Sequence, residues 1–216
     1  MQELSDISIF SGLTEHDFQV ISKVANIQTV AKNHLLISEG DITDTLFLLL
    51  SGEVQIFLSD LDGKEFVLDL LKEGDYFGEL ALLDEEKRTA SAITLGKCTI
   101  ITIKSIDFKE IIHQHPNIYP VLIKNLVSII RKNTENVRML ALTDVYGRFR
   151  KLLNDNSIDM MGIKRVSTKM TQKDIANRIG SSREMVARIL RELSKGDYIT
   201  SKDKLIYIQK PLPEKF

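Results

Sequence analysis

Short β-prone runs, separated by glycine-containing turns, occupy the first half of this chain. The runs are rich in Val, Ile, Leu and Phe and lie at residues 45–50, 54–58, 66–71 and 99–103. Most of the turns are spaced about 11 residues apart, as in compact all-β folds; they are Glu39-Gly40-Asp41, Ser51-Gly52-Glu53, Asp62-Gly63-Lys64, Glu73-Gly74-Asp75 and Leu95-Gly96-Lys97. The pattern predicts a β-barrel or β-roll over residues 27–104, after one or two short helices within residues 5–26.

A helical pattern follows the strands. A short helix is expected at residues 105–113, and His115-Pro116 ends it because the residue before a proline disfavours the α conformation. Residues 117–143 contain no glycine, and alternate steps of four and three residues define a stripe of Leu122, Leu126, Ile129, Asn133, Asn136, Leu140 and Thr143. Such a seam indicates a long helix that pairs with its counterpart in a parallel homodimer. The alternative is a helix that packs on its own domain.

The two asparagines of that stripe are costly to bury unless each finds a hydrogen-bonding partner. They either fix the register of two paired helices, as a buried Asn does in coiled coils, or face a polar ligand that lies against the helix. We favour the ligand, because it fits the candidate chemistry of the β-rich region.

The last third of the chain carries a helix-turn-helix pattern. A helix is expected from residue 142 through Leu153, and the polar stretch 154–162 ends it. Thr171-Gln172-Lys173-Asp174 then resembles a capping box with Asp in the place of Glu or Gln, and Gly180 provides a helix stop. A second helix follows, which Ser181 and Ser182 can cap, and its apolar positions are Met185, Val186, Ile189, Leu190 and Leu193.

That second helix carries groups that read base edges. Arg183 and Glu184 lie in its first turn and Arg188 one turn further on. Arginine pairs bidentately with guanine, and glutamate accepts a hydrogen bond from N4 of cytosine. Strands expected at 198–201 and 205–208 form a β-hairpin wing, whose lysines are placed for phosphates. A purely structural helical hairpin is the alternative, and the contents of the helix argue against it.

Charge is distributed unevenly along the chain. The net charge is −1, yet residues 1–144 hold 13 Lys and Arg against 22 Asp and Glu, whereas residues 145–216 hold 16 against 8. A basic C-terminal part is typical of proteins that bind a polyanion such as nucleic acid. This bias supports DNA as the partner of the helix-turn-helix pattern.

Composition excludes several classes of protein. The single cysteine, Cys98, excludes an intramolecular disulfide and a four-cysteine iron–sulfur cluster, and its apolar surroundings predict a buried thiol. No apolar run is long enough to span a membrane, and the acidic start lacks the features of a signal peptide. A cytosolic protein of one or two domains, with no membrane partner, is therefore expected.

Candidate ligand chemistry is densest between residues 77 and 92. Gly78-Glu79 at a turn offers backbone N–H groups and a carboxylate to a sugar. Arg88-Thr89, beyond a short acidic connector at residues 84–87, offers a planar fork of donors and a hydroxyl to a phosphate. A sugar and a phosphate held together indicate a nucleotide. The alternative is a β-turn followed by a surface ion pair.

The order of these elements resembles a known family. The run Phe77-Gly78-Glu79-Leu80-Ala81-Leu82-Leu83, followed by Arg88-Thr89-Ala90-Ser91-Ala92, looks like the phosphate-binding cassette of cyclic-nucleotide-binding domains. Thr134-Glu135-Asn136-Val137 and Ser182-Arg183-Glu184 closely match the cyclic-AMP receptor protein (catabolite activator) family, within the superfamily that includes the fumarate–nitrate reductase regulators.

The resemblance implies an α+β architecture of three parts. A jelly-roll-like cyclic-nucleotide-binding β-roll would occupy residues 1–116, a dimerisation helix residues 117–143, and a winged helix-turn-helix domain residues 144–216. The implied protein is a homodimeric, cytosolic transcription regulator that is switched by a cyclic nucleotide. RNA polymerase is the further partner that the resemblance implies, and the polar loop 154–164 is a place for that contact.

The resemblance also assigns the nucleotide-binding roles. Gly78 and Leu80 would flank the nucleotide with backbone groups, and Glu79 would take the ribose 2′-hydroxyl. The cyclic phosphate would be bound by Arg88 and Thr89. The base pocket would be lined by Ile56 and Leu68, and the residues that read the base would be Asn133 and Thr134.

The base-reading pair of this chain differs from that of the family, and this difference bears on which base is bound. The family reads adenine with a Thr-Ser pair, one residue supplied across the dimer, and here that pair is Asn133-Thr134. Both side chains can hydrogen-bond a purine edge, so cyclic AMP is the expected effector. Thr89 is also compatible with guanine. The alternative is therefore a regulator of the same fold that answers cyclic GMP or a cyclic dinucleotide, or that is constitutively active.

On DNA, Arg183, Glu184 and Arg188 match the family's trio that reads a TGTGA half-site. The expected operator is therefore a palindrome resembling TGTGA-N6-TCACA. The resemblance places Thr171, Lys173 and Ser182 at DNA phosphates.

An enzyme and a metal-based sensor are disfavoured. The candidate pocket offers one carboxylate, Glu79, and no paired acid and base. A haem sensor needs axial ligands, and His34, His113 and His115 stand in no motif that demands haem. No catalytic residue, metal or haem is therefore expected.

Overall fold

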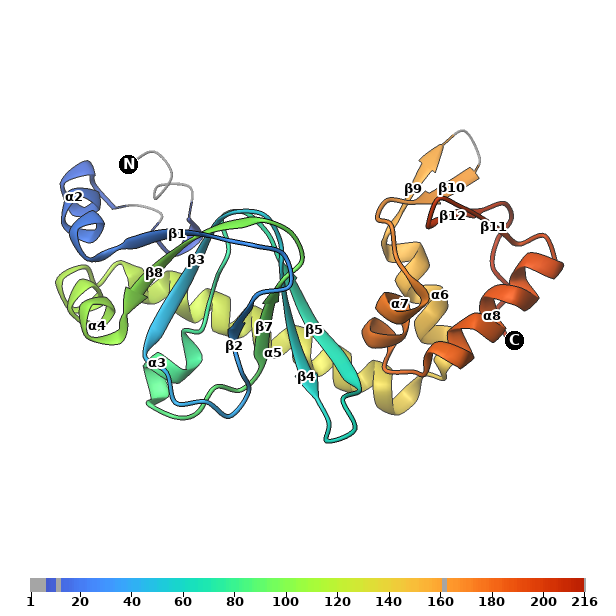
Figure 1. Cartoon of the computed structure of the whole chain (residues 1–216), viewed down its shortest axis with the longest axis horizontal. Helices are drawn as coiled ribbons and strands as arrows, with labels where there is room; N and C mark the ends of the chain where they lie inside the picture. Colours follow the sequence, from blue (N-terminus) through green and yellow to red (C-terminus); the bar gives the residue numbers. More distant parts are fainter. Residues whose placement is uncertain (1–6, 11–12, 161–162, 216) are drawn as a thin grey trace. The chain divides into compact units, whose positions relative to one another are not determined.

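The computed structural model describes residues 7–10, 13–160 and 163–215. The chain divides into two compact units, one made of residues 1–59 and 68–132 and the other of residues 60–67 and 133–216. The first is rich in strands, and the second combines helices with a small sheet (Figure 1).

Two four-stranded sheets form the β-roll of the first unit. One has the order β1-β8-β3-β6, with β1 at Asn26–Val30, β3 at Thr45–Ser51, β6 at Tyr76–Phe77 and β8 at Cys98–Lys104. The other has the order β2-β7-β4-β5, with β2 at Leu35–Ile37, β4 at Val54–Ser59, β5 at Glu65–Leu71 and β7 at Ser91–Thr94. The β-rich character expected of residues 27–104 is confirmed.

Helical segments precede, interrupt and follow these strands. In the described part of the unit they are the 3-10 turn η1 at Ser8–Phe10, α2 at Glu15–Val24, α3 at Leu80–Asp84 and α4 at Ser105–Gln114. The long helix α5 at Ile118–Leu142 follows, and its residues from 133 on belong to the second unit. The sequence pattern did not predict α3. This short helix starts directly after Glu79 and is followed by Glu85, whose left-handed φ of 62° ends it.

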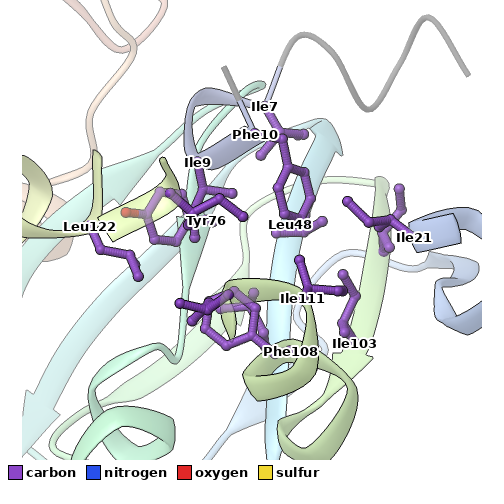
Figure 2. Close-up of a cluster of buried hydrophobic side chains, with 14 of the residues drawn as sticks. Ile7, Ile9, Phe10, Ile21, Leu48, Tyr76, Ile103, Phe108, Ile111 and Leu122 are labelled. Carbon is purple, nitrogen blue, oxygen red and sulfur yellow. The ribbon is translucent and has the colours of Figure 1, made fainter. Parts of the chain in front are cut away.

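Strand β3 is buried on both faces, which explains its uninterrupted apolar run. On one face, Leu46 and Leu48 join a cluster that includes side chains of α2, α4 and α5 (Figure 2). On the other face, Phe47 and Leu49 belong to a second cluster inside the roll. There the ring of Phe47 stacks on that of Phe77 with centroids 5.1 Å apart. Phe77 ends β6 and thereby anchors the segment that leads into Gly78.

The stripe of α5 that packs on the chain's own core differs from the stripe that is exposed. Leu122 is only 2 % exposed and belongs to the cluster of Figure 2. A stripe of exposed apolar positions lies one residue further along, at Ile123, Val127, Ile130 and Val137, with exposed fractions between 43 % and 65 %. Leu122, the first position of the predicted seam, therefore packs inside its own unit, whereas Leu140 of the same seam is 43 % exposed. The pairing of the later seam positions stays a prediction.

The second unit holds the expected helix-turn-helix and wing. Helices α6 (Val145–Asp155), α7 (Gln172–Ile179) and α8 (Arg183–Lys195) share one apolar core with a sheet of order β11-β12-β10-β9. Strands β11 (Ile199–Lys202) and β12 (Leu205–Ile208) form the predicted hairpin wing.

A second hairpin replaces the polar loop expected at residues 154–164. Strand β9 (Ser157–Met160) pairs with β10 (Ile163–Val166), and β10 pairs in turn with β12, where Lys164 lies opposite Ile208. A lone two-stranded hairpin is marginal in water. These two strands therefore depend on β12, more than 40 residues away, and the loop prediction failed because local patterning carries no sign of that partner.

Candidate functional site

The turn between β6 and α3 accommodates glycine alone at position 78. Gly78 has a φ of +86°, in the left-handed region that side chains rarely adopt. A Cβ atom here would lie 2.7 Å from Nη1 of Arg88 and 3.1 Å from the carbonyl oxygen of Thr45. The absence of a side chain therefore lets Arg88 approach the backbone of the turn.

Arg88 is buried and held by the chain's own acceptors. It is 3 % exposed, and Nη1 donates to the carbonyl of Gly78, Nη2 to the carbonyl of Thr45 and Nε to the hydroxyl of Thr43, each at 2.6 Å. A guanidinium has five N–H groups. Among the described residues, three of these groups are thus satisfied and two are not, one on each terminal nitrogen.

The charge of Arg88 is balanced by nearby carboxylates. Burial lowers the pKa of its guanidinium, whereas the negative charges of Asp44 and Glu79 oppose that shift. Arginine remains protonated under such conditions. The fork is therefore a fixed positive charge in a largely water-free place, where an anion is bound more strongly than at the surface.

Glu79 lies beside this arginine and is also buried, at 4 % exposure. Burial raises the pKa of its carboxyl group, and a backbone hydrogen bond together with the charge of Arg88 counters that shift only in part. A buried carboxylate is costly unless it accepts hydrogen bonds. Any further hydrogen bond that this group accepts would therefore stabilise its charged form.

The other predicted nucleotide-site residues of this unit lie around the same strands. Leu80 begins α3, and Thr89 is exposed next to the buried Arg88. Ile56 of β4 pairs with Ala92, four residues after the arginine, and Leu68 lies in β5, the neighbouring strand. Both side chains are half-buried, as the walls of an open pocket would be.

Asn133 and Thr134 lie on α5 in the second unit. Both are exposed. Thr134 falls on the exposed apolar stripe of that helix, between Ile130 and Val137, and Asn133 is its neighbour. Their part in a nucleotide site stays a prediction.

The caps of the helix-turn-helix agree with the sequence analysis. Thr171 and Asp174 form a reciprocal capping box at the start of α7, and Gly180 ends that helix with a left-handed φ of 62°. The hydroxyl of Ser182 accepts a bond of 3.2 Å from the backbone N–H of Met185 and so starts α8. A hydroxyl that accepts in this way can still donate its own hydrogen.

Helix α8 presents its polar residues outward. Its buried face is Val186, Ile189 and Leu193, whereas Arg183, Glu184 and Arg188 are all exposed. Backbone hydrogen bonding, aided by Ser182, lowers the pKa of the Glu184 carboxyl group. At neutral pH that group is therefore a charged acceptor between cations.

A basic hollow lies beside α7 and the wing. Its volume is about 500 Å³, and its lining includes Thr171, Lys173, Arg183 and Lys204. Thr171 and Lys173 are thereby brought together with the wing, as contacts to one DNA backbone require.

Two structural contributors were not predicted. Arg88 donates to Thr43, in the loop before β3, and to Thr45, the first residue of β3; both lie more than 40 residues away and stand in no motif. Arg148 of α6 donates to the carbonyls of Thr143 and Ile179 and so fastens the end of α7 to α6.

Within the described ranges, no helix has the length and apolar character to cross a membrane.

Comparison with known proteins agrees with this layout. The family described as cyclic nucleotide-binding domain matches residues 27–115, and the Crp-like helix-turn-helix domain matches residues 147–211. The solved structure of CLP of Xanthomonas campestris, described as a c-di-GMP-responsive global regulator, superposes with a TM-score of 0.81 at 20 % identity, over 91 % of this chain and 100 % of that one.

Curated relatives cover most of the chain. The cAMP-activated global transcriptional regulator Vfr of Pseudomonas aeruginosa is 32 % identical over 180 residues, which is 80 % of this chain and 84 % of that protein. A CRP-like cAMP-activated global transcriptional regulator of Mycobacterium tuberculosis is 29 % identical over 95 % of this chain and 93 % of its own length. The chain therefore belongs to the Crp/Fnr family of transcription regulators, with a cyclic nucleotide-binding domain followed by a helix-turn-helix DNA-binding domain.

Proposed function

We propose that this regulator is a homodimer that binds cyclic AMP and then an operator resembling TGTGA-N6-TCACA. The proposal that a cyclic nucleotide binds rests on the burial and hydrogen bonding of Arg88. Its guanidinium is buried beside Glu79, and two of its N–H groups, one on each terminal nitrogen, have no acceptor among the described residues. A cyclic phosphate offers two exocyclic oxygens to such a fork.

Glu79 complements this interaction at the sugar. A ribose 2′-hydroxyl would donate to the carboxylate and stabilise its charged form, which burial otherwise disfavours. Backbone groups of Gly78 and Leu80, together with the hydroxyl of Thr89, would complete the polar contacts. Arg88 and Glu79 thus require a phosphate and a sugar hydroxyl in one ligand, which is the combination found in a cyclic nucleotide.

The base would lie against the apolar side chains of Ile56 and Leu68. Cyclic AMP is our choice because relatives that cover most of the chain are described as cAMP-activated. Asn133 and Thr134 would then hydrogen-bond the purine edge, one of them from the second protomer.

The exposed stripe of α5 supports the homodimer. Ile123, Val127 and Ile130 recur at steps of four and three residues, the spacing of a coiled-coil seam, and each is at least 43 % exposed. A second copy of the same helix would cover these side chains. Thr134 continues this stripe, which would bring the base-reading residues to the dimer interface.

For DNA, Arg183, Glu184 and Arg188 would read base edges in the major groove. Thr171, Lys173 and Ser182 would bind phosphates and set the register. Such a protein works in the cytosol and has RNA polymerase as its further partner. Cyclic AMP would act by binding the DNA-competent arrangement more tightly than the inactive one, since equal affinity for both shifts nothing.

Calorimetric titration of the purified protein with cyclic AMP tests the nucleotide half. We expect saturable binding near one nucleotide per chain for the wild type, and loss of that binding in Arg88→Ala with the fold retained by circular dichroism. An unchanged nucleotide affinity in Arg88→Ala would overturn the assignment of the cassette.

One observation favours a different class of effector. The structural neighbour CLP is described as responsive to c-di-GMP, and the base-reading pair here is Asn-Thr. The competing proposal is therefore a regulator of the same fold that answers cyclic GMP or a cyclic dinucleotide, or that needs no ligand. Competition between cyclic AMP, cyclic GMP and c-di-GMP for the purified protein separates these cases.

A further inference from the structure

A threonine in the loop before β3 contacts the Nε edge of Arg88. The Nε–H group donates to Oγ1 of Thr43 over 2.6 Å. The same loop also fixes the arginine backbone, because the Gly40 N–H donates to the Arg88 carbonyl and the Arg88 N–H donates to the Asp41 carbonyl, each at 2.9 Å. Residues 40–45 therefore form the base on which this arginine rests.

Each of the three bonds made by the guanidinium uses a different nitrogen. Two acceptors are backbone carbonyls, those of Gly78 and Thr45, and no substitution at those positions removes them. Thr43 supplies the one side-chain acceptor that the described residues give this group. Three bonds at three nitrogens fix the plane of the guanidinium, and with it the direction of the two remaining N–H groups.

Thr43 differs from Arg88 in burial. Thr43 is exposed, whereas Arg88 is 3 % exposed. An exposed threonine contributes little apolar burial to the fold, so its hydroxyl can be removed at small cost to stability. A buried N–H that loses its acceptor is unsatisfied, and the planar group is then held at two nitrogens in place of three.

We propose that Thr43 is a positioning residue of the nucleotide site, which orients the Arg88 fork toward the phosphate of the ligand. This proposal rests on the proposed binding of a cyclic nucleotide by Arg88. Preorganisation of a fork saves the cost of ordering it when the ligand arrives. The hydroxyl of Thr43 therefore raises affinity without touching the ligand.

Two variants at this position separate the hydroxyl from the shape of the side chain. Thr43→Val keeps the shape and removes the acceptor, and Thr43→Ser keeps the acceptor. By calorimetry with cyclic AMP we expect Thr43→Val to bind about tenfold more weakly, which corresponds to about 1.4 kcal/mol, and Thr43→Ser to recover most of that loss. Thr29→Val, the same change at an exposed position of β1, is the matched control and should bind as the wild type does.

A second measurement does not depend on the ligand. The Nε–H resonance of Arg88, assigned by its absence in Arg88→Lys, should exchange slowly with water in the wild type and in Thr43→Ser, and rapidly in Thr43→Val. Wild-type protein that binds no cyclic nucleotide would refute the proposed function. The exchange rates alone would then show whether the Thr43 hydroxyl holds the Arg88 guanidinium in place. Equal affinities in wild type and Thr43→Val, equal exchange rates, or equal weakening by Val and Ser would each overturn the positioning role.

Discussion

Nη1 of Arg88 donates a hydrogen bond of 2.6 Å to the carbonyl oxygen of Gly78, and the missing side chain of Gly78 is what admits it. The cassette is thus a backbone turn and a buried cation that fit together before any ligand arrives. Both partners belong to the first unit, so their contact is set within one compact body.

Gly78→Ala should therefore disable the site. Its φ of +86° costs a side chain roughly 1–3 kcal/mol, and the new Cβ would also displace Nη1 of Arg88. We expect lower stability in urea and a loss of more than about tenfold in affinity for cyclic AMP. Gly63→Ala is the control, because its φ is +76° but nothing lies within 4 Å of the added Cβ. Equal affinities in the two variants would contradict the steric argument.

Glu79→Gln should stabilise the protein while weakening its ligand binding. Burial raises the pKa of Glu79 above its usual 4.5, so the folded state holds the proton more tightly than the unfolded state does. The stability from this group is complete below pH 4.5 and is lost as pH rises through the raised pKa. In urea titrations the unliganded variant should thus exceed the wild type at pH 7 and match it below pH 4.5.

The nucleotide affinity of Glu79→Gln should fall, because a hydrogen bond to a charged group contributes about 1.5–3 kcal/mol. Glu85→Gln is the matched control, since the hydrogen bond from Lys109 lowers the pKa of that exposed carboxyl group. The control should gain no stability at pH 7. A Glu79→Gln variant that is less stable at pH 7, or that binds cyclic AMP unchanged, would count against the assignment.

Arg188→Ala and Lys173→Ala should weaken DNA binding in different ways. Loss of a base contact by Arg188 should cost about 1–3 kcal/mol on the TGTGA operator and relax base choice at one position. Loss of a phosphate contact by Lys173 should weaken binding to all sequences and lower the slope of log affinity against log salt by about 0.9. Fluorescence anisotropy on operator and random duplexes distinguishes them. Equal losses by Arg188→Ala on both duplexes would show that Arg188 binds phosphate.

Ile123→Asp combined with Val127→Asp should break the homodimer. The two side chains are 59 % and 43 % exposed on one stripe of α5, and a charge there would have to be desolvated between two copies. Sedimentation should give a monomer for this variant and a dimer for the wild type. Ser128→Asp, at the adjacent exposed polar position, should remain dimeric. A dimeric double variant would refute the interface.

The strands with strong local signals were predictable. Glycine turns bounded β3, β4 and β5 in the sequence, and Thr171 and Gly180 marked the limits of α7. The hairpin β9–β10 was not predictable, because its stability comes from pairing with β12. The burial of Leu122 was not predictable either, since both Leu122 and Ile123 are apolar and only the packed core shows which of them is buried.

Some residues of the candidate site were predictable from the sequence, and others were not. Gly78, Glu79 and Arg88 stand in a recognisable run, and the structure brings them together. The contribution of Thr43 comes from a loop 45 residues before the arginine, and a hydroxyl in a loop gives no local sign of its partner. Bonds to backbone carbonyls leave no sequence signal, because every residue has such a group.

The most direct test of the account is the affinity of the purified protein for a fluorescent TGTGA-N6-TCACA duplex, measured by anisotropy with and without saturating cyclic AMP. We predict that cyclic AMP tightens operator binding at least about tenfold, that it has little effect on a scrambled duplex, and that Arg88→Ala abolishes the effect. The same operator affinity with and without cyclic AMP, in protein that binds the nucleotide, would contradict the claim that this nucleotide switches DNA binding.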